Sequence, residues 1–332
     1  MPFKMITDTL RARMLRTTAV ALLGVLAAGL AHAQAYPTRP ITFIYPYAAG
    51  SLVDNAWRAT LVEVSKRLGQ QVVMENRPGA GGRTGTEAVM KAAPDGYTLG
   101  GGANAVIVVQ ALIEPRLFIE PVKHYTPVIN GFETYLLLVA RNGTPYRDVK
   151  GLIAYAKANP GKINGGSPGA GTGSHLSLSM LATKGGIDFP SIHYKGSAPT
   201  LTAILSGEVD IYFADPGAKP HIDAGKMQGI AVTGPQRWAS FPNLPTMQEA
   251  GLSGFTFASW HSVIAPPGLP QDLTTTINRA FNDALNLPDL RGKLEAVGWV
   301  VKGGTPAELN ALIKSDLDLF RPIVRAANIK LD

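Results

Sequence analysis

The sequence predicts an α/β protein with room for two hydrophobic cores. Short apolar runs alternate along the chain with segments of helical periodicity, which is typical of sheets flanked by helices. Most of these apolar runs show no polar alternation, as expected of parallel strands that are covered on both faces. Beyond the N-terminal segment, about 300 residues remain, which is long for one core and sufficient for two.

The first 33 residues have the organisation of a secretory signal peptide. Basic residues precede a small and apolar segment, Ala19–Leu30, and the region ends in Ala31-His32-Ala33. A membrane anchor is the alternative, but this segment falls well short of the roughly 20 apolar residues that a spanning helix needs. We therefore expect cleavage after Ala33 and export, most simply to a bacterial periplasm.

Six apolar runs are expected to form strands. They cover residues 41–47, 71–76, 135–140, 192–195, 210–215 and 230–234. Between the first two runs, four apolar residues at helical spacing predict an amphipathic helix. These residues are Trp57, Leu61, Val64 and Leu68.

A long helix is expected near the C-terminus. Thr305 and Glu308 have the spacing of a capping box, and Pro306 stands at the first helical position. The same pattern predicts that Pro322 ends or kinks this helix, because an interior proline removes a backbone hydrogen bond.

Charge and composition exclude several classes of protein. The formal net charge is +7, but the first 33 residues contribute four basic residues and one acidic residue. The basic residues in the rest of the chain are scattered along the sequence. A nucleic-acid-binding face would cluster them, so the mild excess indicates solubility and some attraction for small anions. The chain has no cysteine, which excludes disulfides and lipid-modified cysteine. Its histidines lack helical metal-ligand spacing, so we expect no cofactor and no metal.

One stretch formally matches a hydrolase motif. Residues 165–169, GGSPG, fit G-x-S-x-G, in which Ser167 would be the nucleophile. The next residue, Pro168, has no backbone N–H for an oxyanion hole, and losing one such donor costs roughly 2.7 to 4 kcal/mol. We interpret the match as accidental and keep a secreted serine hydrolase as the least favoured hypothesis. The glycine-rich segments also miss the phosphate-loop and dinucleotide-binding patterns.

The glycine-rich stretch at residues 166–176 opens a predicted helix. Unpaired backbone N–H groups and the helix dipole favour an anion at such a position. The hydroxyls of Thr172 and Ser174 can donate to the same oxygen atoms, and a carboxylate fits better than a triphosphate because no phosphate-loop lysine is present. Alternatively, Thr172 or Ser174 only caps the helix. The local sequence leaves both interpretations open.

A second turn of this kind follows the first predicted strand. Residues 46–58 place small side chains at a strand-to-helix turn, with Asp54 near the helix start. Ligands of open α/β sheets bind outside the carboxyl ends of the strands. Two such turns in different halves of the chain could therefore face each other across a cleft and grip the two ends of a dicarboxylate.

Seven segments of the sequence together carry a resemblance to one known family. They are residues 36–54, 75–89, 93–99, 157–176, 193–199, 229–251 and 290–298. These segments span essentially all of residues 36–326, and in content and order they resemble the periplasmic solute-binding receptors of tripartite tricarboxylate transporters, also called the Bug or TctC-like family.

The resemblance implies a two-lobed periplasmic binding protein fold of type II-like architecture. Each lobe would be a sheet flanked by helices, with the ligand cleft between the lobes. Lobe 1 would comprise residues 34–134 plus 256–332, and lobe 2 residues 135–255. Crossover strands are expected near residues 133–139 and 257–263. We expect a monomer that closes on its ligand.

The resemblance also implies which residues bind the ligand. In the family, the turn after the first strand and the glycine-rich turn of the second lobe bind carboxylate groups, largely through backbone N–H groups and bridging water. The corresponding residues here are Tyr47, Ala48, Ala49 and Gly50 in lobe 1, and Gly171, Thr172 and Ser174 in lobe 2. Ser51 would add a hydroxyl in lobe 1, and Lys195, Gly196 and Ala198 would form the wall beside the glycine-rich turn.

Three departures from the family pattern affect the expected ligand. Ser51 stands where a second glycine is usual, and Gly173 where a serine is usual, so the polar groups of the pocket are redistributed. Asp215 follows Phe213-Ala214, where the family commonly has Phe-Asp-Asn. This carboxylate would meet a ligand amine or hydroxyl, or else cap a helix.

For function, the resemblance implies a receptor that delivers a small carboxylate to a membrane transporter. The alternative from another class is a ligand-dependent sensor, which presents its closed form to a signalling protein. The sequence does not separate these two functions.

Overall fold

The computed structural model describes residues 36–113 and 121–326. The chain divides into two compact units, Met1–Thr38 and Arg39–Asp332, and the elements below belong to the second. The predicted signal peptide and its cleavage site lie outside the described residues. Across the described ranges, no helix combines the length and apolar character that crossing a membrane requires.

The first sheet has six strands in the order β11-β4-β10-β3-β1-β2. Their bounds are β1 Ile41–Tyr45, β2 Val72–Asn76, β3 Thr98–Ala103, β4 Thr126–Tyr135, β10 Ala258–Ala265 and β11 Val300–Gly303. β1 is parallel to β2 and β3, whereas β10 is antiparallel to β3 and β4, and β11 is antiparallel to β4. The sheet is therefore mixed, and the expectation of parallel strands holds only for its β3-β1-β2 part.

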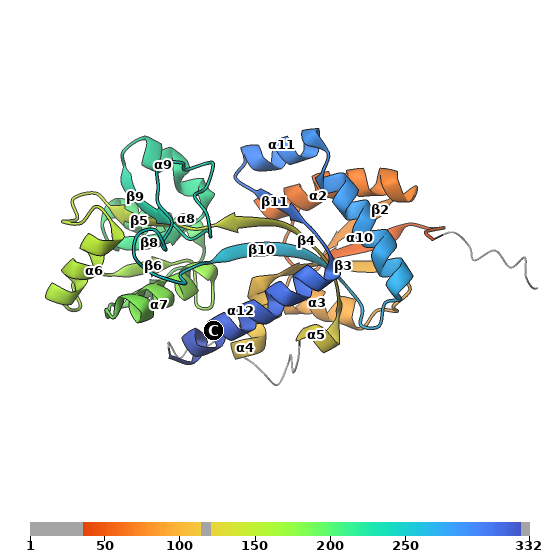
Figure 1. The fold of residues 1–332 in the computed structure, drawn as a ribbon, viewed down its shortest axis with the longest axis horizontal. Coiled ribbons are helices and arrows are strands. Elements are labelled where there is room, and N and C mark those ends of the chain that lie inside the picture. Colours follow the sequence, from red (N-terminus) through yellow and green to blue (C-terminus); the bar gives the residue numbers. More distant parts are fainter. Residues whose placement is uncertain (1–35, 114–120, 327–332) are drawn as a thin grey trace, which may run out of the picture. The chain divides into compact units, whose positions relative to one another are not determined.

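The second sheet has five strands in the order β7-β6-β8-β5-β9. They are β5 Leu137–Arg141, β6 Gly165–Ser167, β7 Ser191–His193, β8 Ile211–Ala214 and β9 Met227–Val232. β6 is parallel to β7 and β8, whereas β5 is antiparallel to β8 and β9. The chain leaves the first sheet at the end of β4 and returns to it with β10, and both strands are long ribbons that run toward the second sheet (Figure 1).

Helices cover both faces of the first sheet. They are α2 Leu52–Leu68, α3 Arg83–Met90, α4 Ala111–Ile113, α5 Pro121–His124, α10 Gln271–Leu285, α11 Pro288–Ala296 and α12 Pro306–Ala326, together with the short helices η1 Ala80–Gly82 and η2 Ala105–Gln110. Figure 1 shows α2 and α11 above this sheet, and α3, α4 and α12 below it. The predicted amphipathic helix is α2, which buries Trp57, Leu61 and Val64.

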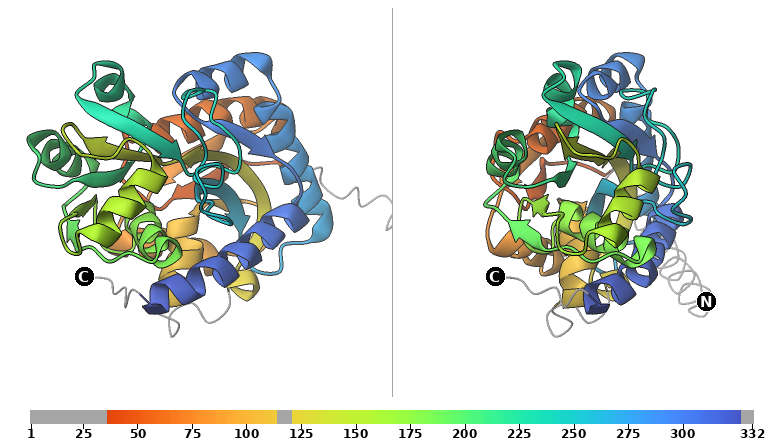
Figure 2. Two further views of the ribbon diagram at one scale, coloured as in Figure 1. Left: turned by 60° about the vertical axis from the view of Figure 1, so that its left-hand side comes forward. Right: turned by 90° about the vertical axis from the view of Figure 1, so that its left-hand side faces the viewer.

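Helices also cover both faces of the second sheet, as the two further views show (Figure 2). They are α6 Val149–Ala158, α7 Gly173–Gly185, α8 Ser197–Ser206 and α9 Lys219–Asp223, with the short helix η3 Pro216–Ala218 before α9. The apolar side chains of α6 and α7 join one buried cluster, and those of α8 join another. The fold is α/β with two lobes, each built on its own sheet.

The largest buried cluster connects the two sheets. It includes Ile44 of β1, Trp260 of β10, Phe320 of α12, Leu138 of β5 and Leu176 of α7. Phe257, just before β10, contacts Phe320 with ring centroids 5.7 Å apart. α12 therefore packs against apolar groups from both lobes.

Several strands could not be predicted from apolar runs. β3 has the sequence TLGGGA and β6 the sequence GGS, so glycine replaces most of the β-branched and aromatic residues that mark a strand. Close packing explains the glycines, because a Cβ on Gly101 would lie 2.9 Å from Cδ2 of Tyr45. The prediction of one strand at residues 135–140 was wrong at its start, since Leu136 separates β4 from β5.

The C-terminal helix begins as predicted. Glu308 Oε2 accepts the Thr305 N–H at 2.6 Å, and the Thr305 hydroxyl accepts the Glu308 N–H at 3.2 Å. Both bonds of the capping box are thus present. The helix continues past Pro322 to Ala326, so Pro322 does not end it, and the alternative that this proline kinks the helix stays a prediction.

Candidate functional site

Three of the predicted site segments lie side by side at one edge of the second sheet. β7, β6 and β8 are adjacent and parallel, so their carboxyl ends meet at the same edge. The turn after β6 carries Gly171–Ser174, the turn after β7 carries Lys195–Ala198, and Asp215 follows β8. The Gly196 N–H donates to Pro168 O at 2.9 Å and joins the first two turns.

Thr172 caps α7. Its Oγ1 accepts the His175 N–H at 3.4 Å and donates to Gly169 O at 2.8 Å. The Gly171 N–H is also used within the turn, because it donates to His175 Nδ1 at 3.1 Å. The capping interpretation therefore holds for the Thr172 side chain, and the turn has a fixed internal structure.

Ser174 differs from Thr172 in having a free hydroxyl. Its side chain is 4% exposed, and its Oγ has no partner among the described residues. The backbone N–H groups of Gly173 and Ser174 belong to the first turn of α7, where no intrahelical acceptor exists, and no acceptor outside the helix lies within reach in the described part of the chain. The start of α7 thus presents unpaired donors and the positive end of a helix dipole.

The other predicted residues of the second lobe occupy varied positions. Lys195 and Ala198 are exposed, and Gly196 has the positive φ of +108° that lets the chain turn into α8. The half-buried Asp215 caps η3, because its Oδ1 accepts the Gly217 N–H at 2.9 Å. Of the two roles left open for Asp215, this structure contains the helix cap.

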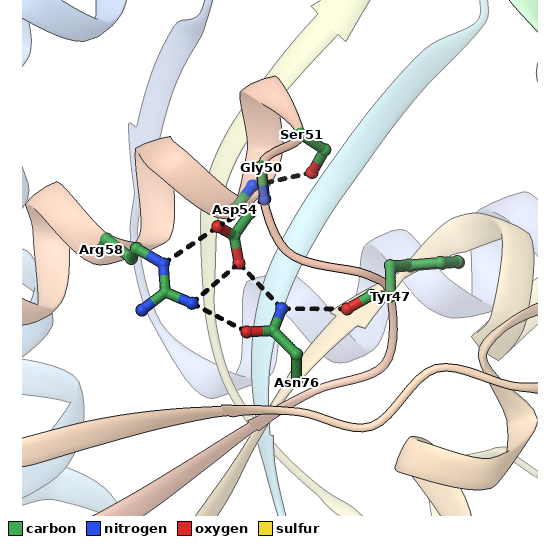
Figure 3. A network of polar contacts seen from close by, with 6 residues as sticks. All are labelled: Tyr47, Gly50, Ser51, Asp54, Arg58 and Asn76. Carbon is green, nitrogen blue, oxygen red and sulfur yellow. Dashed lines mark hydrogen bonds and ion pairs between the residues drawn. The ribbon is translucent and has the colours of Figure 1, made fainter.

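A buried carboxylate organises the turn after β1 (Figure 3). Asp54 is only 1% exposed. Its Oδ2 accepts a hydrogen bond from the Gly50 N–H at 3.1 Å and one from Arg58 Nε at 2.9 Å. Its Oδ1 accepts a hydrogen bond from Asn76 Nδ2 at 2.8 Å. Asn76 also donates to Tyr47 O at 2.9 Å and accepts from Arg58 Nη2 at 2.7 Å. The network therefore ties the turn to β2 and to α2.

This network fixes which groups of the first turn are available. The Gly50 N–H is engaged by Asp54, and Ser51 Oγ accepts the Asp54 N–H at 3.0 Å as the cap of α2. Ala48 and Ala49 are exposed, and within the described ranges no acceptor contacts their N–H groups. Burial and the neighbouring Tyr45 raise the pKa of the Tyr47 phenol, so this group stays protonated and can donate.

Several residues of these turns were missed by sequence reasoning. Arg58 and Asn76 lie 18 positions apart and meet only because β2 pairs with β1, so no local pattern could join them. Asp54 was noticed at the helix start, but not as an acceptor. His175 stands four residues after Gly171, and that spacing is the one local signal that indicates the hydrogen bond between them.

We predict that Asp54→Asn destabilises the fold and that the loss depends on pH. Burial raises the pKa of the Asp54 carboxyl, but hydrogen bonds from Arg58, Asn76 and Gly50 outweigh burial and hold it below the ordinary value of 3.8. A depressed pKa stabilises the fold above pH 3.8, and this contribution disappears as the pH falls through the lower, folded-state pKa. Urea unfolding at pH 7 should show a loss of about 1.5 to 3 kcal/mol, which shrinks in acid.

The control is Asp223→Asn. Asp223 forms an exposed pair with Lys219 one helical turn away, and such pairs contribute little. A loss at pH 7 that is no larger for Asp54→Asn than for Asp223→Asn would contradict the role given to the buried carboxylate.

Comparison with known sequences finds a family model that matches most of the chain. The family described as "Tripartite tricarboxylate transporter family receptor" (TctC) matches residues 57–329. Protein BugT of Bordetella pertussis is 31% identical over 323 residues, which cover 96% of this chain and 99% of BugT.

Two solved structures with bound ligands are also similar. A Rhodopseudomonas palustris protein with adipate superposes with a TM-score of 0.73 at 30% identity, over 90% of this chain and 100% of that one. MatC from the same organism, with bound malate, has a TM-score of 0.72 at 30% identity, over 87% of this chain and 100% of MatC.

Proposed function

We propose that this chain, which belongs to the family of tripartite tricarboxylate transporter receptors, captures a small dicarboxylate or tricarboxylate and delivers it to a membrane transporter. The resemblance to the Bug, or TctC-like, receptors is confirmed. As a member of this family, the chain is a solute-binding receptor and not an enzyme. It belongs with periplasmic binding proteins in fold and sequence.

The observation that carries the proposal is the start of α7. The N–H groups of Gly173 and Ser174 and the buried Ser174 hydroxyl are donors that find no acceptor among the described residues. A buried polar group without a partner is costly, and a carboxylate has the charge and the lone pairs to satisfy several donors at a helix N-terminus. One ligand carboxylate would bind here.

The second carboxylate would bind at the turn after β1. There the unpaired N–H groups of Ala48 and Ala49 and the Tyr47 phenol are the available donors, while Gly50 and Ser51 shape the turn. The turn after β7, with Lys195, Gly196 and Ala198, would form the wall beside α7. Asp215 would reach a ligand hydroxyl or amine only by giving up its cap on η3.

The two lobes would close on the ligand. In this proposal lobe 1 is residues 34–134 plus 256–332 and lobe 2 is residues 135–255, with the cleft between them and the crossovers near residues 133–139 and 257–263. Closure follows if the closed form contacts both carboxylates, because a ligand shifts a conformational equilibrium only through differential contacts. The mature receptor, cleaved after Ala33, would work as a monomer in the periplasm.

The melting temperature of refolded, ligand-free protein tests this function. A panel of mono-, di- and tricarboxylates should contain one that raises the melting temperature by several degrees, because a ligand at 100 times its Kd adds about 2.7 kcal/mol. A matched panel of the corresponding amides, which lack the charge, is the control. If no carboxylate shifts the melt, or if the amides shift it equally, the function is wrong.

A sensor role is the second candidate, and a pull-down with and without ligand separates the two. Transport requires that a membrane transporter captures the liganded receptor, whereas sensing requires a signalling protein. Hydrolysis through Ser167 is not supported. Ser167 Oγ lies 2.8 Å from His193 Nδ1, as a nucleophile and its base would. Its side chain is nevertheless fully buried and donates to Gly169 O, and Pro168 offers no N–H for an oxyanion hole.

A further inference from the structure

The turn between β6 and α7 folds back on the helix that it opens. The Gly171 N–H points at His175 Nδ1, with 3.1 Å between the nitrogen atoms. His175 is 8% exposed, so water cannot readily replace this acceptor. An imidazole nitrogen accepts a hydrogen bond only when it carries no proton, and the contact therefore requires neutral His175 with its proton on Nε2.

A second histidine contacts the same turn from β7. His193 Nδ1 lies 2.8 Å from Ser167 Oγ, which also lies 3.0 Å from Gly169 O. When Ser167 donates to Gly169 O, His193 donates to Ser167. This bond survives protonation of His193, because the donating Nδ1–H is present in both the neutral ring and the cation.

The two imidazoles cannot both be charged at low cost. Their ring centroids are 4.3 Å apart, and His193 is exposed whereas His175 is buried. Burial, followed by the charge of His193, lowers the pKa of His175 from 6.5 to about 4, so His175 stays neutral at pH 7.

Other elements packed on α7 do not add to the pKa shift of His175. β6 contains no titratable residue, and Tyr212 of β8 lies in the buried cluster on the α8 face of the sheet. No charged group of α12 contributes to the pKa shift of His175. Among the described residues, His193 is the titratable group that acts on His175.

We propose that His175 is a positioning residue for carboxylate binding. Its unprotonated Nδ1 holds the Gly171 N–H against α7, which fixes the turn and leaves the N–H groups of Gly173 and Ser174 free for the ligand. His175 itself does not contact the ligand. This inference rests on the proposed function, and it adds that binding depends on an acceptor at position 175.

Two substitutions at position 175 distinguish the role of the hydrogen-bond acceptor from the role of the imidazole ring. His175→Asn keeps an acceptor near Nδ1 and cannot be protonated in the working range, whereas His175→Leu removes the acceptor. His221→Leu, on α9 of the same lobe, is the control for loss of a histidine. Affinity for malate and for adipate is measured by titration calorimetry at pH 7 and at pH 3.5, and melting of the ligand-free variants reports the fold.

At pH 7 we expect His175→Leu to bind about tenfold more weakly or worse, and His175→Asn and His221→Leu to bind as the wild type does. Between pH 7 and pH 3.5, below the pKa of about 4 of His175, the wild type should lose more affinity than His175→Asn. The ligand's own carboxyl groups titrate in this range, so the comparison is between proteins at each pH.

Three outcomes would overturn the inference. Unchanged affinity of a folded His175→Leu would show that the turn needs no acceptor. Failure of a folded His175→Asn to restore affinity would assign the effect to the ring and not to the hydrogen bond, and equal pH profiles would remove the role of protonation. If the wild type binds no carboxylate at all, the proposed function fails first and the inference falls with it.

Discussion

Ser174→Ala should weaken carboxylate binding by about 10- to 150-fold without weakening the fold, because a hydrogen bond to a charged group contributes about 1.5 to 3 kcal/mol. The Ser174 hydroxyl is buried and has no partner among the described residues, so its removal breaks no internal bond. Removing an unsatisfied buried hydroxyl is neutral or stabilising for the ligand-free protein. Calorimetric titration and thermal melting measure the two effects separately.

The chain offers a matched control on the same helix. Ser177 is also fully buried with an unpartnered Oγ, but it lies one helical turn further from the start of α7. Ser177→Ala should therefore change the affinity little. Equal loss of affinity in the two variants would mean that Ser174 has no special relation to the ligand.

Gly173→Ser should both destabilise the protein and weaken binding. A Cβ at position 173 would lie 2.4 Å from Cζ of Phe257, and Phe257 is buried against Phe320. A ring so enclosed cannot swing aside freely, and overpacking of this kind costs about 1 to 3 kcal/mol. The start of α7 would move with its free N–H groups. Chemical denaturation and ligand titration of the variant measure the two losses.

Two further variants test whether the clash with Phe257 causes these losses of stability and affinity. Gly292→Ser places the same side chain in α11, where it meets nothing within 4 Å, and should leave stability within about 0.5 kcal/mol of the wild type. In the double variant Gly173→Ser with Phe257→Leu, the smaller residue should return part of the lost affinity. A double variant whose losses simply add would contradict the steric explanation.

This contact also explains a departure in the sequence. The family resemblance implied serine at the position of Gly173, and the absence of that hydroxyl suggested a redistributed pocket. The structure adds that Phe257, 84 positions later, occupies the space that a side chain at position 173 would need. Sequence spacing could not reveal this reason, because the contact joins the start of α7 to the segment before β10.

Elements with a local signature were predictable, and those made by long-range packing were not. The capping box at Thr305 placed the start of α12, and apolar spacing from Trp57 to Leu68 placed most of α2. β3 and β6 consist largely of glycine because neighbouring side chains leave no room for a Cβ, as Val209 Cγ2 at 2.9 Å does for Gly166. Such strands carry no apolar signal.

The same distinction applies to the candidate site. Both turns were found because small and hydroxyl residues between a strand and a helix indicate exposed N–H groups. The hydrogen bonds that hold the turns in place could not be predicted from the sequence, because they come from other strands. Asn76 of β2 bonds to Tyr47 O, and His193 of β7 bonds to Ser167. For Thr172 and Asp215, the sequence could not decide between capping and ligand contact, and in this structure both side chains cap helices.

The central claim is that the start of α7 binds a ligand carboxylate. A crystal structure of the protein with the carboxylate that raises its melting temperature most tests this claim directly. We expect one carboxylate within hydrogen-bonding distance of the Gly173 N–H, the Ser174 N–H and Ser174 Oγ, and the other group near the N–H groups of Ala48 and Ala49. A carboxylate bound elsewhere, with the start of α7 still unpaired, would contradict the account.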